Sequence, residues 1–398
     1  MQSIESPHRD KRGASKVANE VLKKGGEVAS EVSGETRGFD FEGMRFGMKA
    51  WRASASGARE GGSPVAPIVF VHGFAQQAST WDDVAQLLTD AGARCFGFEL
   101  AGHGVGACSA GDGPAERSGF FDLLFQARAL LAFCGTVARD AGVAPVLVGY
   151  SMGGRVALQA ACLVGAGPRD GGPKGGGKLD RTALRSSAAF APCDRTGRLD
   201  VAGVGQRDTA TTSAGDAVRM SAAVPFSALV LESAGLGPVD DAAREALRER
   251  NFAWAARVRG EGVSAFMDWW AGLPLFESQC KLANEQRERL RAGRLANDTE
   301  SLALSFERAG AHAMPSQGES IRALCELAAK GIPVSYLAGE LDAKYCKVAS
   351  TLQSESQGAI SCCVVPAAGH SIHLERPEAF GAILEEVVES CTPKPAAP

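Results

Sequence analysis

Short apolar runs bounded by Pro or Gly recur along the chain and alternate with segments of helical spacing. Runs of consecutive apolar residues are typical of strands that are buried on both faces of a parallel sheet. The strand candidates are 67–73, 95–100, 145–150, 226–233, 331–339 and 360–369. Helical spacing is found over 120–142, which ends at Gly142, and over 378–391. This alternation predicts an α/β fold with a mostly parallel central sheet and helices on both of its faces.

Three stretches depart from this alternation. Residues 1–64 are mainly polar, and we expect a largely disordered extension. Residues 166–224 are rich in Gly, Pro, Ser and Thr, which predicts a loop insertion. Residues 239–316 show helical spacing and no strand pattern, which predicts a helical lid. The predicted core is therefore made of residues 65–238 and 317–392, with the lid inserted between its two parts.

Composition and charge limit the function. At about 100–200 residues per domain, a length of 398 would suggest two or three domains. Gly is also in excess, with 48 residues. The polar extension and the insertion account for both the extra length and the extra Gly. One catalytic unit is then expected. A net charge of −4 argues against a nucleic-acid partner bound by a general positive field, and no apolar run is long enough for a transmembrane helix.

The cysteines indicate the compartment. The eleven cysteines are scattered, without a CxxC pair or a metal-ligand spacing. We therefore expect reduced, mostly buried thiols in an intracellular, reducing compartment, and no metal site. The sequence leaves the oligomeric state open.

The strongest local motif is G-x-S-x-G at 149–153, which follows the strand candidate at 145–150 and opens a helical segment. A strand, a sharp turn and a helix are the context that a nucleophilic serine of this kind requires. The turn strains the serine backbone, and the glycines leave room for the close approach of neighbouring chain. Ser151 is the predicted nucleophile.

An HG turn at His72–Gly73 ends the first strong strand candidate. In α/β-hydrolases, a backbone N–H after such a turn and the N–H after the serine together form the oxyanion hole. The expected donors here are Phe74 and Met152. His72 itself, like His103 in the later AGHG sequence, is interpreted as a structural loop residue.

The order Ser, acid, His along the chain completes the pattern. His370 follows the last strand candidate and a glycine, which is the expected place for the base. Asp342 follows the strand candidate at 331–339, and Glu340 is the second choice for the acid. One helix and one strand should separate Asp342 from His370.

These motifs identify a resemblance to the α/β-hydrolase superfamily over residues 65–392. Within it, the chain resembles 2-succinyl-6-hydroxy-2,4-cyclohexadiene-1-carboxylate synthase of menaquinone and phylloquinone biosynthesis. The segments that carry this resemblance are VFVHGF (69–74), AGHG (101–104), LVGYSMGGRVAL (147–158), LVLES (229–233), FMDWWAGLPLF (266–276), LAGELDAKY (337–345) and AGHSIHLERP (368–377).

The resemblance implies a carbon–oxygen lyase that eliminates pyruvate from an enolpyruvyl-bearing cyclohexene carboxylate and needs no cofactor. Ser151, activated by His370 and oriented by Asp342, would take the proton. The compartment would be the cytoplasm or a plastid, because this kind of quinone synthesis occurs in bacteria and in plastids.

A substrate with several carboxylates needs cations, and the planar fork of arginine suits them. Arg155 lies one helical turn after Ser151 on the same side. The resemblance also implies a second arginine at Arg294, and Arg248 is the best candidate for a third. By the same resemblance, the other substrate-binding residues are Tyr150, Trp269 and His373.

Two other functions remain open. The first is a serine hydrolase of the same fold, either an esterase or a carbon–carbon bond hydrolase, because the same triad serves both chemistries. Arg155 and the arginine-bearing lid favour the polycarboxylate lyase. The second is a receptor of the same fold without catalysis, against which the complete Ser151, Asp342 and His370 argue.

Overall fold

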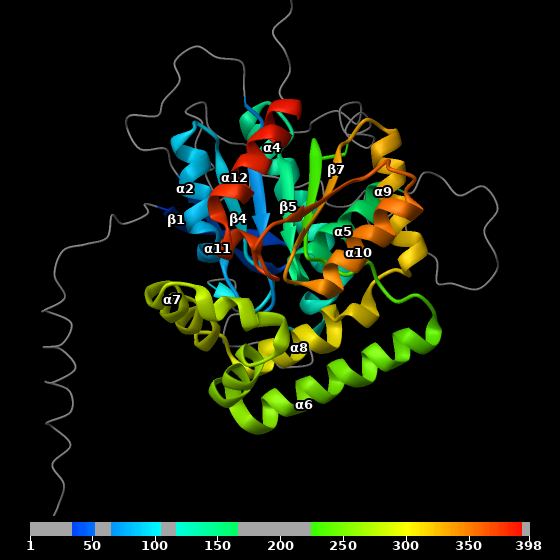
Figure 1. Ribbon diagram of the computed structural model, residues 1–398. Coiled ribbons are helices and arrows are strands. Elements are labelled where there is room, and N and C mark those ends of the chain that lie inside the picture. The colour runs from blue at the N-terminus through cyan, green and yellow to red at the C-terminus, as the bar shows by residue number, and fades with distance from the viewer. Residues whose placement is uncertain (1–33, 52–64, 105–116, 166–223, 392–398) are drawn as a thin grey trace, which may run out of the picture. The chain divides into compact units, whose positions relative to one another are not determined.

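Eight strands form one sheet in the computed structural model, which describes residues 34–51, 65–104, 117–165 and 224–391. The strand order is β1-β2-β4-β3-β5-β6-β7-β8 (Figure 1). The strands are β1 (Gly34–Phe41), β2 (Met44–Trp51), β3 (Ile68–Val71), β4 (Cys95–Phe98), β5 (Val146–Tyr150), β6 (Ala228–Glu232), β7 (Val334–Gly339) and β8 (Ser361–Val365). From β4 to β8 all neighbours are parallel. The six strands predicted from apolar runs are confirmed.

The first two strands correct the predicted boundary of the extension. β1 and β2 form an antiparallel hairpin, and β2 pairs with β4 at the edge of the sheet. The turn uses Glu42 and Gly43, both with positive φ (44° and 84°), as a tight hairpin turn requires. Apolar residues alternate on both strands, and the buried ones are Phe39, Phe41, Met44, Phe46, Met48 and Trp51. This period of two was a readable strand signal within the polar composition.

The two faces of the sheet pack against different helices. Alternate residues of β3 separate: Val69 and Val71 join the core formed with α4 (Leu123–Ala141) and α5 (Met152–Gly165). Phe70 points to the other face, where its ring stacks on Trp81 at 4.7 Å. There α2 (Asp82–Asp90) packs against α12 (Pro377–Cys391). This alternation confirms a sheet that is covered on both faces.

The remaining helices of the core continue the predicted order. Helix α9 (Gln317–Ala329) packs on α5, and α10 (Ala343–Glu355) joins β7 to β8. The short α11 (Ile372–Glu375) and the turns η1 (Ala78–Trp81) and η3 (Ser118–Phe121) complete the described core. Helix α4 ends as expected at Gly142, which has a left-handed φ of 71°.

The lid between β6 and α9 is helical, as the spacing predicts. It contains α6 (Asp241–Ala271), η6 (Pro274–Lys281), α7 (Asn284–Leu295), α8 (Thr299–Ala309) and η7 (Ala311–Ala313). Helix α6 is kinked at Gly262, whose φ of 78° is outside the helical range. Helix α6 packs along α8 (Figure 1).

The described residues from Gly34 onward form one compact unit. The loop insertion predicted over 166–224 and most of the predicted extension lie outside the described residues. The nine described cysteines are free thiols, but only Cys95 and Cys134 are buried, so the expectation of mostly buried thiols is wrong. No helix in the described part is long and apolar enough to cross a membrane.

Candidate active site

Ser151 occupies the sharp turn between β5 and α5. Its φ of 50° is left-handed, which is a strained conformation for a residue with a side chain. The turn is crowded: a Cβ added to Gly153 would lie 2.3 Å from the carbonyl oxygen of Val71, and one on Gly149 would lie 2.8 Å from that of Gly153. Only glycine fits at these two positions, which explains the G-x-S-x-G spacing.

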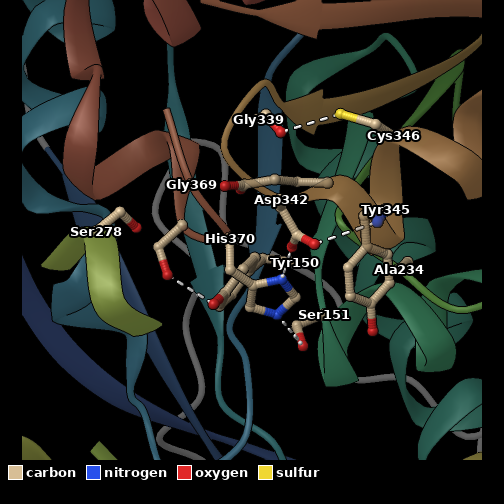
Figure 2. A network of polar contacts seen from close by, with 12 residues as sticks. Tyr150, Ser151, Ala234, Ser278, Gly339, Asp342, Tyr345, Cys346, Gly369 and His370 are labelled. Atoms are coloured by element: carbon tan, nitrogen blue, oxygen red, sulfur yellow. Dashed lines mark hydrogen bonds and ion pairs between the residues drawn. The ribbon is translucent and has the colours of Figure 1, made fainter. Parts of the chain in front are cut away.

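Ser151, His370 and Asp342 converge at the carboxyl ends of the parallel strands β5, β8 and β7. The Nδ1 of His370 lies 2.8 Å from Oδ2 of Asp342, and its Nε2 lies 3.1 Å from Oγ of Ser151. Figure 2 shows the imidazole between the carboxylate and the hydroxyl. Because a carboxylate only accepts, Nδ1 carries the proton, and Nε2 is free to accept the serine proton. One helix and one strand separate Asp342 from His370, as expected.

The other oxygen of Asp342 is also used. Its Oδ1 accepts the backbone N–H of Tyr345 at 3.2 Å and so caps the start of α10. The carboxylate is thereby fixed in orientation by its own helix. Glu340, the alternative acid, is exposed and instead accepts the N–H of Ala367 at 2.8 Å. Asp342 is therefore the acid that meets His370.

The loop after β3 lies beside the turn that carries Ser151. The N–H of Gly73 donates to Oε1 of Gln76 at 3.2 Å, and that of Ala75 donates to Nε2 of His103 at 3.2 Å. The N–H of Phe74 lies between these two engaged groups. Met152 is the first residue of α5, so its N–H has no acceptor within the helix. This backbone arrangement leaves both groups as candidate oxyanion donors.

His72 and His103 hold the loops together, as predicted for structural residues. His72 Nδ1 donates to the carbonyl of Gly73 at 2.8 Å, and its Nε2 accepts the N–H of Leu100 at 3.1 Å. Burial, with the nearby His103, lowers the pKa of His72 to about 3. Burial also lowers the pKa of His103 to about 4. Both rings are therefore neutral, and their hydrogen bonds connect the loop after β3 to the loop after β4.

Arg155 lies at the site without an acidic partner in the described part of the chain. Its NH1 donates to the carbonyl of Ala309 in the lid at 3.0 Å. Burial lowers the pKa of this guanidinium to about 10; Tyr345 acts to raise it and Arg250 to lower it. An arginine that is desolvated in this way and lacks a carboxylate nearby favours an anionic ligand.

Arg294 is the second such cation. It is only 6% exposed, and its NH2 donates to Oε1 of Gln279 at 3.1 Å. Its guanidinium lies over the ring of Phe276, 5.3 Å from the centroid. Its Nε is buried and has no hydrogen-bond partner among the described atoms. Burial lowers the pKa of Arg294, and Tyr150 acts to raise it.

The structure does not support Arg248 as the third arginine. Arg248 is exposed on α6, where it forms an ion pair of 2.6 Å with Glu245 one turn earlier. Arg250, two residues further along α6, is also exposed, but it is the arginine that interacts electrostatically with Arg155 and Tyr345. Two residues along a helix differ by about 200° in direction, so the sequence neighbours face opposite ways.

A similar correction applies to Trp269. Its ring contacts the lid aromatics Trp254 and Phe266, and the guanidinium of Arg257 covers it at 4.0 Å. The next residue, Trp270, instead lies 5.0 Å from Phe74 and 5.7 Å from Phe276, measured between ring centroids. The ring of Phe276 in turn contacts His370. Trp270 is therefore the lid tryptophan beside Phe74 in the loop after β3.

His373 has no exposed surface, so it does not contact a substrate directly. Its Nδ1 lies 2.9 Å from both carboxylate oxygens of Glu232, and its ring stacks on Trp81 at 4.1 Å. The pair joins the end of β6 to α11 behind Tyr150. The expected substrate contact is replaced by a buried structural pair.

Sequence reasoning missed Tyr345. The residue is 9% exposed, its ring lies 4.8 Å from that of His370, and its phenol interacts electrostatically with Arg155 and Arg250. Its position three residues after Asp342, in the first turn of α10, was a readable signal, because that turn must lie beside the acid. Among the described residues, no group of three His, Cys, Asp or Glu side chains is placed to hold a metal ion.

The fold and the strand-end site define the class. The family model described as the alpha/beta hydrolase family matches residues 68–383, and the chain belongs to this family.

The relatives narrow the comparison. A protein of Citrobacter koseri (strain ATCC BAA-895) named 2-succinyl-6-hydroxy-2,4-cyclohexadiene-1-carboxylate synthase is 29% identical over 319 residues, which cover 80% of this chain and 92% of that protein. A Bacillus subtilis (strain 168) protein carries the same name on a provisional basis. It is 34% identical over 166 residues, which cover 41% of this chain and 57% of that protein.

Among solved structures, MenH from S. aureus has a TM-score of 0.58 at 21% identity, and the match covers 86% of this chain and 97% of that one. A thermophilic esterase from Thermogutta terrifontis has a TM-score of 0.52 at 18% identity, and the match covers 90% and 100%. At these identities the likeness concerns the fold alone.

Proposed function

We propose that this protein is a 2-succinyl-6-hydroxy-2,4-cyclohexadiene-1-carboxylate synthase, a pyruvate-eliminating lyase of menaquinone biosynthesis. The observation that carries the proposal is a pair of arginines, the half-buried Arg155 and the buried Arg294, beside the Ser151–His370–Asp342 constellation. Neither arginine has a carboxylate partner among the described residues. A ligand with at least two carboxylates would neutralise both, and the product in the names of the relatives carries a succinyl group and a ring carboxylate.

The reaction follows from the positions of the double bonds. The substrate, 2-succinyl-5-enolpyruvyl-6-hydroxy-3-cyclohexene-1-carboxylate, has its ring double bond at C3–C4. The product has double bonds at C2–C3 and C4–C5. A base therefore removes the proton from C2, the ring electrons move toward C5, and the C5–O bond to the enolpyruvyl group breaks. The released enolpyruvate takes up a proton on carbon to become pyruvate.

In this proposal His370 accepts the proton of Ser151, and the serine oxygen removes the proton from C2. Asp342 keeps the imidazole in the tautomer with its proton on Nδ1. The C2 carbon is next to the succinyl ketone, so negative charge develops on that carbonyl oxygen. The N–H groups of Phe74 and Met152 would stabilise it as an oxyanion hole. No water is consumed and no acyl-enzyme forms.

The carboxylates position the ring. Arg155 lies one helical turn after Ser151 in α5, and Arg294 is linked through Gln279 to Ser371, the residue after His370. A polycarboxylate bound to both arginines would lie over Ser151. Arg250 would supply a further positive charge, and the phenol of Tyr345 a hydrogen bond, next to Arg155. Held in this way, the C2–H bond would be presented to the serine oxygen.

The test uses the full chain with the enolpyruvyl substrate. Pyruvate release is followed by coupled reduction, and diene formation by its absorbance. We expect both products in equal amounts, and p-nitrophenyl acetate should be a poor substrate. Fast ester hydrolysis without pyruvate release would favour a hydrolase and contradict the lyase. Binding of the substrate without turnover in the wild-type chain would favour a receptor.

A further inference from the structure

A chain of buried polar contacts runs from the lid to the residue before the nucleophile. Arg294 NH2 donates to Oε1 of Gln279 at 3.1 Å, and Nε2 of Gln279 donates to Oγ of Ser371 at 2.9 Å. Oγ of Ser371 lies 2.7 Å from the phenol oxygen of Tyr150. All four side chains are buried. The contacts therefore link α7, η6, the loop after His370 and the end of β5.

The direction of these hydrogen bonds follows from their first member. A guanidinium can only donate, so the oxygen of the Gln279 amide faces Arg294 and its NH2 group faces Ser371. The Ser371 oxygen thus accepts from Gln279 and has one proton of its own to donate. Among the described residues, the only acceptor within reach of that proton is the phenol oxygen of Tyr150. Tyr150 then accepts a hydrogen bond and keeps its own proton.

Two donors remain for a ligand. Burial raises the pKa of Tyr150 well above its ordinary value, so the phenol stays protonated. The Nε–H of the neighbouring Arg294 is buried and has no partner among the described atoms. A carboxylate has two oxygens and could accept one hydrogen bond from each group.

We propose that Gln279 and Ser371 are positioning residues that keep Tyr150 a hydrogen-bond donor, so that Tyr150 and Arg294 together receive one carboxylate of the substrate. The identity of that substrate rests on the proposed function, whereas the direction of the hydrogen bonds does not. Hydrogen bonds that begin at a cation also polarise one another, which strengthens the last donor in the series. Specificity for the carboxylate would thus depend on two uncharged residues that do not touch it.

Gln279→Glu is the sharpest test because it keeps the size of the side chain and reverses the polarity. A carboxylate accepts from both Arg294 and Ser371, so the serine proton turns toward position 279. The serine oxygen must then accept the hydrogen bond from the phenol of Tyr150, so this phenol can no longer donate to the substrate. We expect KM to rise at least tenfold while the melting temperature is retained. Gln353→Glu, on the exposed face of α10, adds the same charge as a control and should leave KM unchanged.

The double variant separates this mechanism from a merely structural role. Ser371→Ala removes the acceptor of the phenol proton, so Tyr150 can again donate to the substrate. Gln279→Glu combined with Ser371→Ala should therefore have a KM at least threefold lower than Gln279→Glu alone. Equal or worse binding by the double variant would overturn the proposal.

A readout without activity comes from the tyrosines, of which the chain has three: Tyr150, Tyr336 and Tyr345. With tyrosine labelled with ¹³C at the ζ position, three signals are expected, and the variant Tyr150→Phe assigns one of them. Gln279→Glu should shift the Tyr150 signal and leave that of Tyr336, which donates to the carbonyl of Ala234 at 2.7 Å, in place. An unmoved Tyr150 signal would overturn the proposal. A moved signal in a protein that releases no pyruvate would support the hydrogen-bond direction and refute the proposed function.

Discussion

The loops at the strand ends and the lid meet at one site, but their polar groups are satisfied in different ways. In the strand-end loops, His72, His103 and Asp342 have protein partners for both of their side-chain polar atoms. At the junction with the lid, the half-buried Arg155 and the buried Arg294 have no acidic partner among the described residues. A network in which every polar atom is hydrogen-bonded fixes the geometry of the site. Desolvated charges without a partner instead favour the binding of a ligand of opposite charge.

This difference suggests how the two regions divide the work. The strand ends carry a constellation that many enzymes of the family could use, because it is built from backbone turns and three side chains. The cations that would select a polycarboxylate lie in the lid or touch it. If this division is correct, changes in the two regions should affect different kinetic parameters.

The largest effect is expected for Ser151→Ala. Removal of the base should lower kcat by roughly 10⁴-fold, because a triad member acts only in the transition state. Substrate binding, measured by calorimetry, should persist within a factor of a few, since the arginines remain. A variant that loses binding as well as turnover would show that the serine loop also determines recognition.

The next effect is a loss of stability at low pH, which we expect to arise in the strand-end loops and not in the lid. The pKa of His72 is lowered to about 3 and that of His103 to about 4, from 6.5 in the unfolded chain. Below pH 6.5 the unfolded chain binds protons that the folded chain does not, so stability falls as the pH decreases from 6.5 toward 4.

At pH 5 each of these histidines should lower the free energy of unfolding by about 2 kcal/mol. Denaturant unfolding between pH 7 and pH 5 measures this loss. His103→Asn should show a shallower pH dependence than the wild type, whatever its stability at pH 7. If the free energy of unfolding of this variant depended on pH as steeply as that of the wild type, His103 would not be a cause of the acid sensitivity.

Arg155 and Arg248 offer a matched comparison of a half-buried and an exposed arginine. Arg155→Ala should raise KM by about 10- to 100-fold, since a hydrogen bond to a charged group contributes about 1.5–3 kcal/mol. Arg248→Ala should leave KM unchanged, because its partner is Glu245 on the surface of α6. Arg155→Lys, which keeps the charge but loses the fork, should fall between them. A large effect at Arg248 would restore the interpretation from the sequence.

The smallest effect is expected for the ion pairs between two helices of the lid. Arg259 on α6 pairs with Glu300, at 2.8 Å, and with Glu307, both on α8. These groups are partly exposed, so Arg259→Ala should cost at most about 1 kcal/mol of stability. Thermal unfolding measures this loss, and kcat should not change. A fall in kcat would indicate that lid packing controls the chemistry.

The sequence by itself determined the parts of the protein that depend on local rules. Consecutive apolar runs predict parallel strands, because such strands are buried on both faces. The glycines around Ser151 predict the elbow, because no other residue fits there. From the order of strands alone, Asp342 and His370 could be assigned, since parallel strands end at the same edge. The hairpin at 34–51 was predictable from its alternation but was obscured by the polar residues around it.

Only the tertiary structure decided which lid residues face the site. Neighbours such as Arg248 and Arg250, or Trp269 and Trp270, have the same composition and the same helical context. The packing of α6 determines that Trp270 is buried while Trp269 is only partly so, and that Arg250, not Arg248, acts electrostatically on Arg155. Gln279, Ser371 and Tyr150 come from three distant segments, and no spacing in the sequence connects them. Long-range packing places such contacts, whereas sequence patterns report only the period of the local chain.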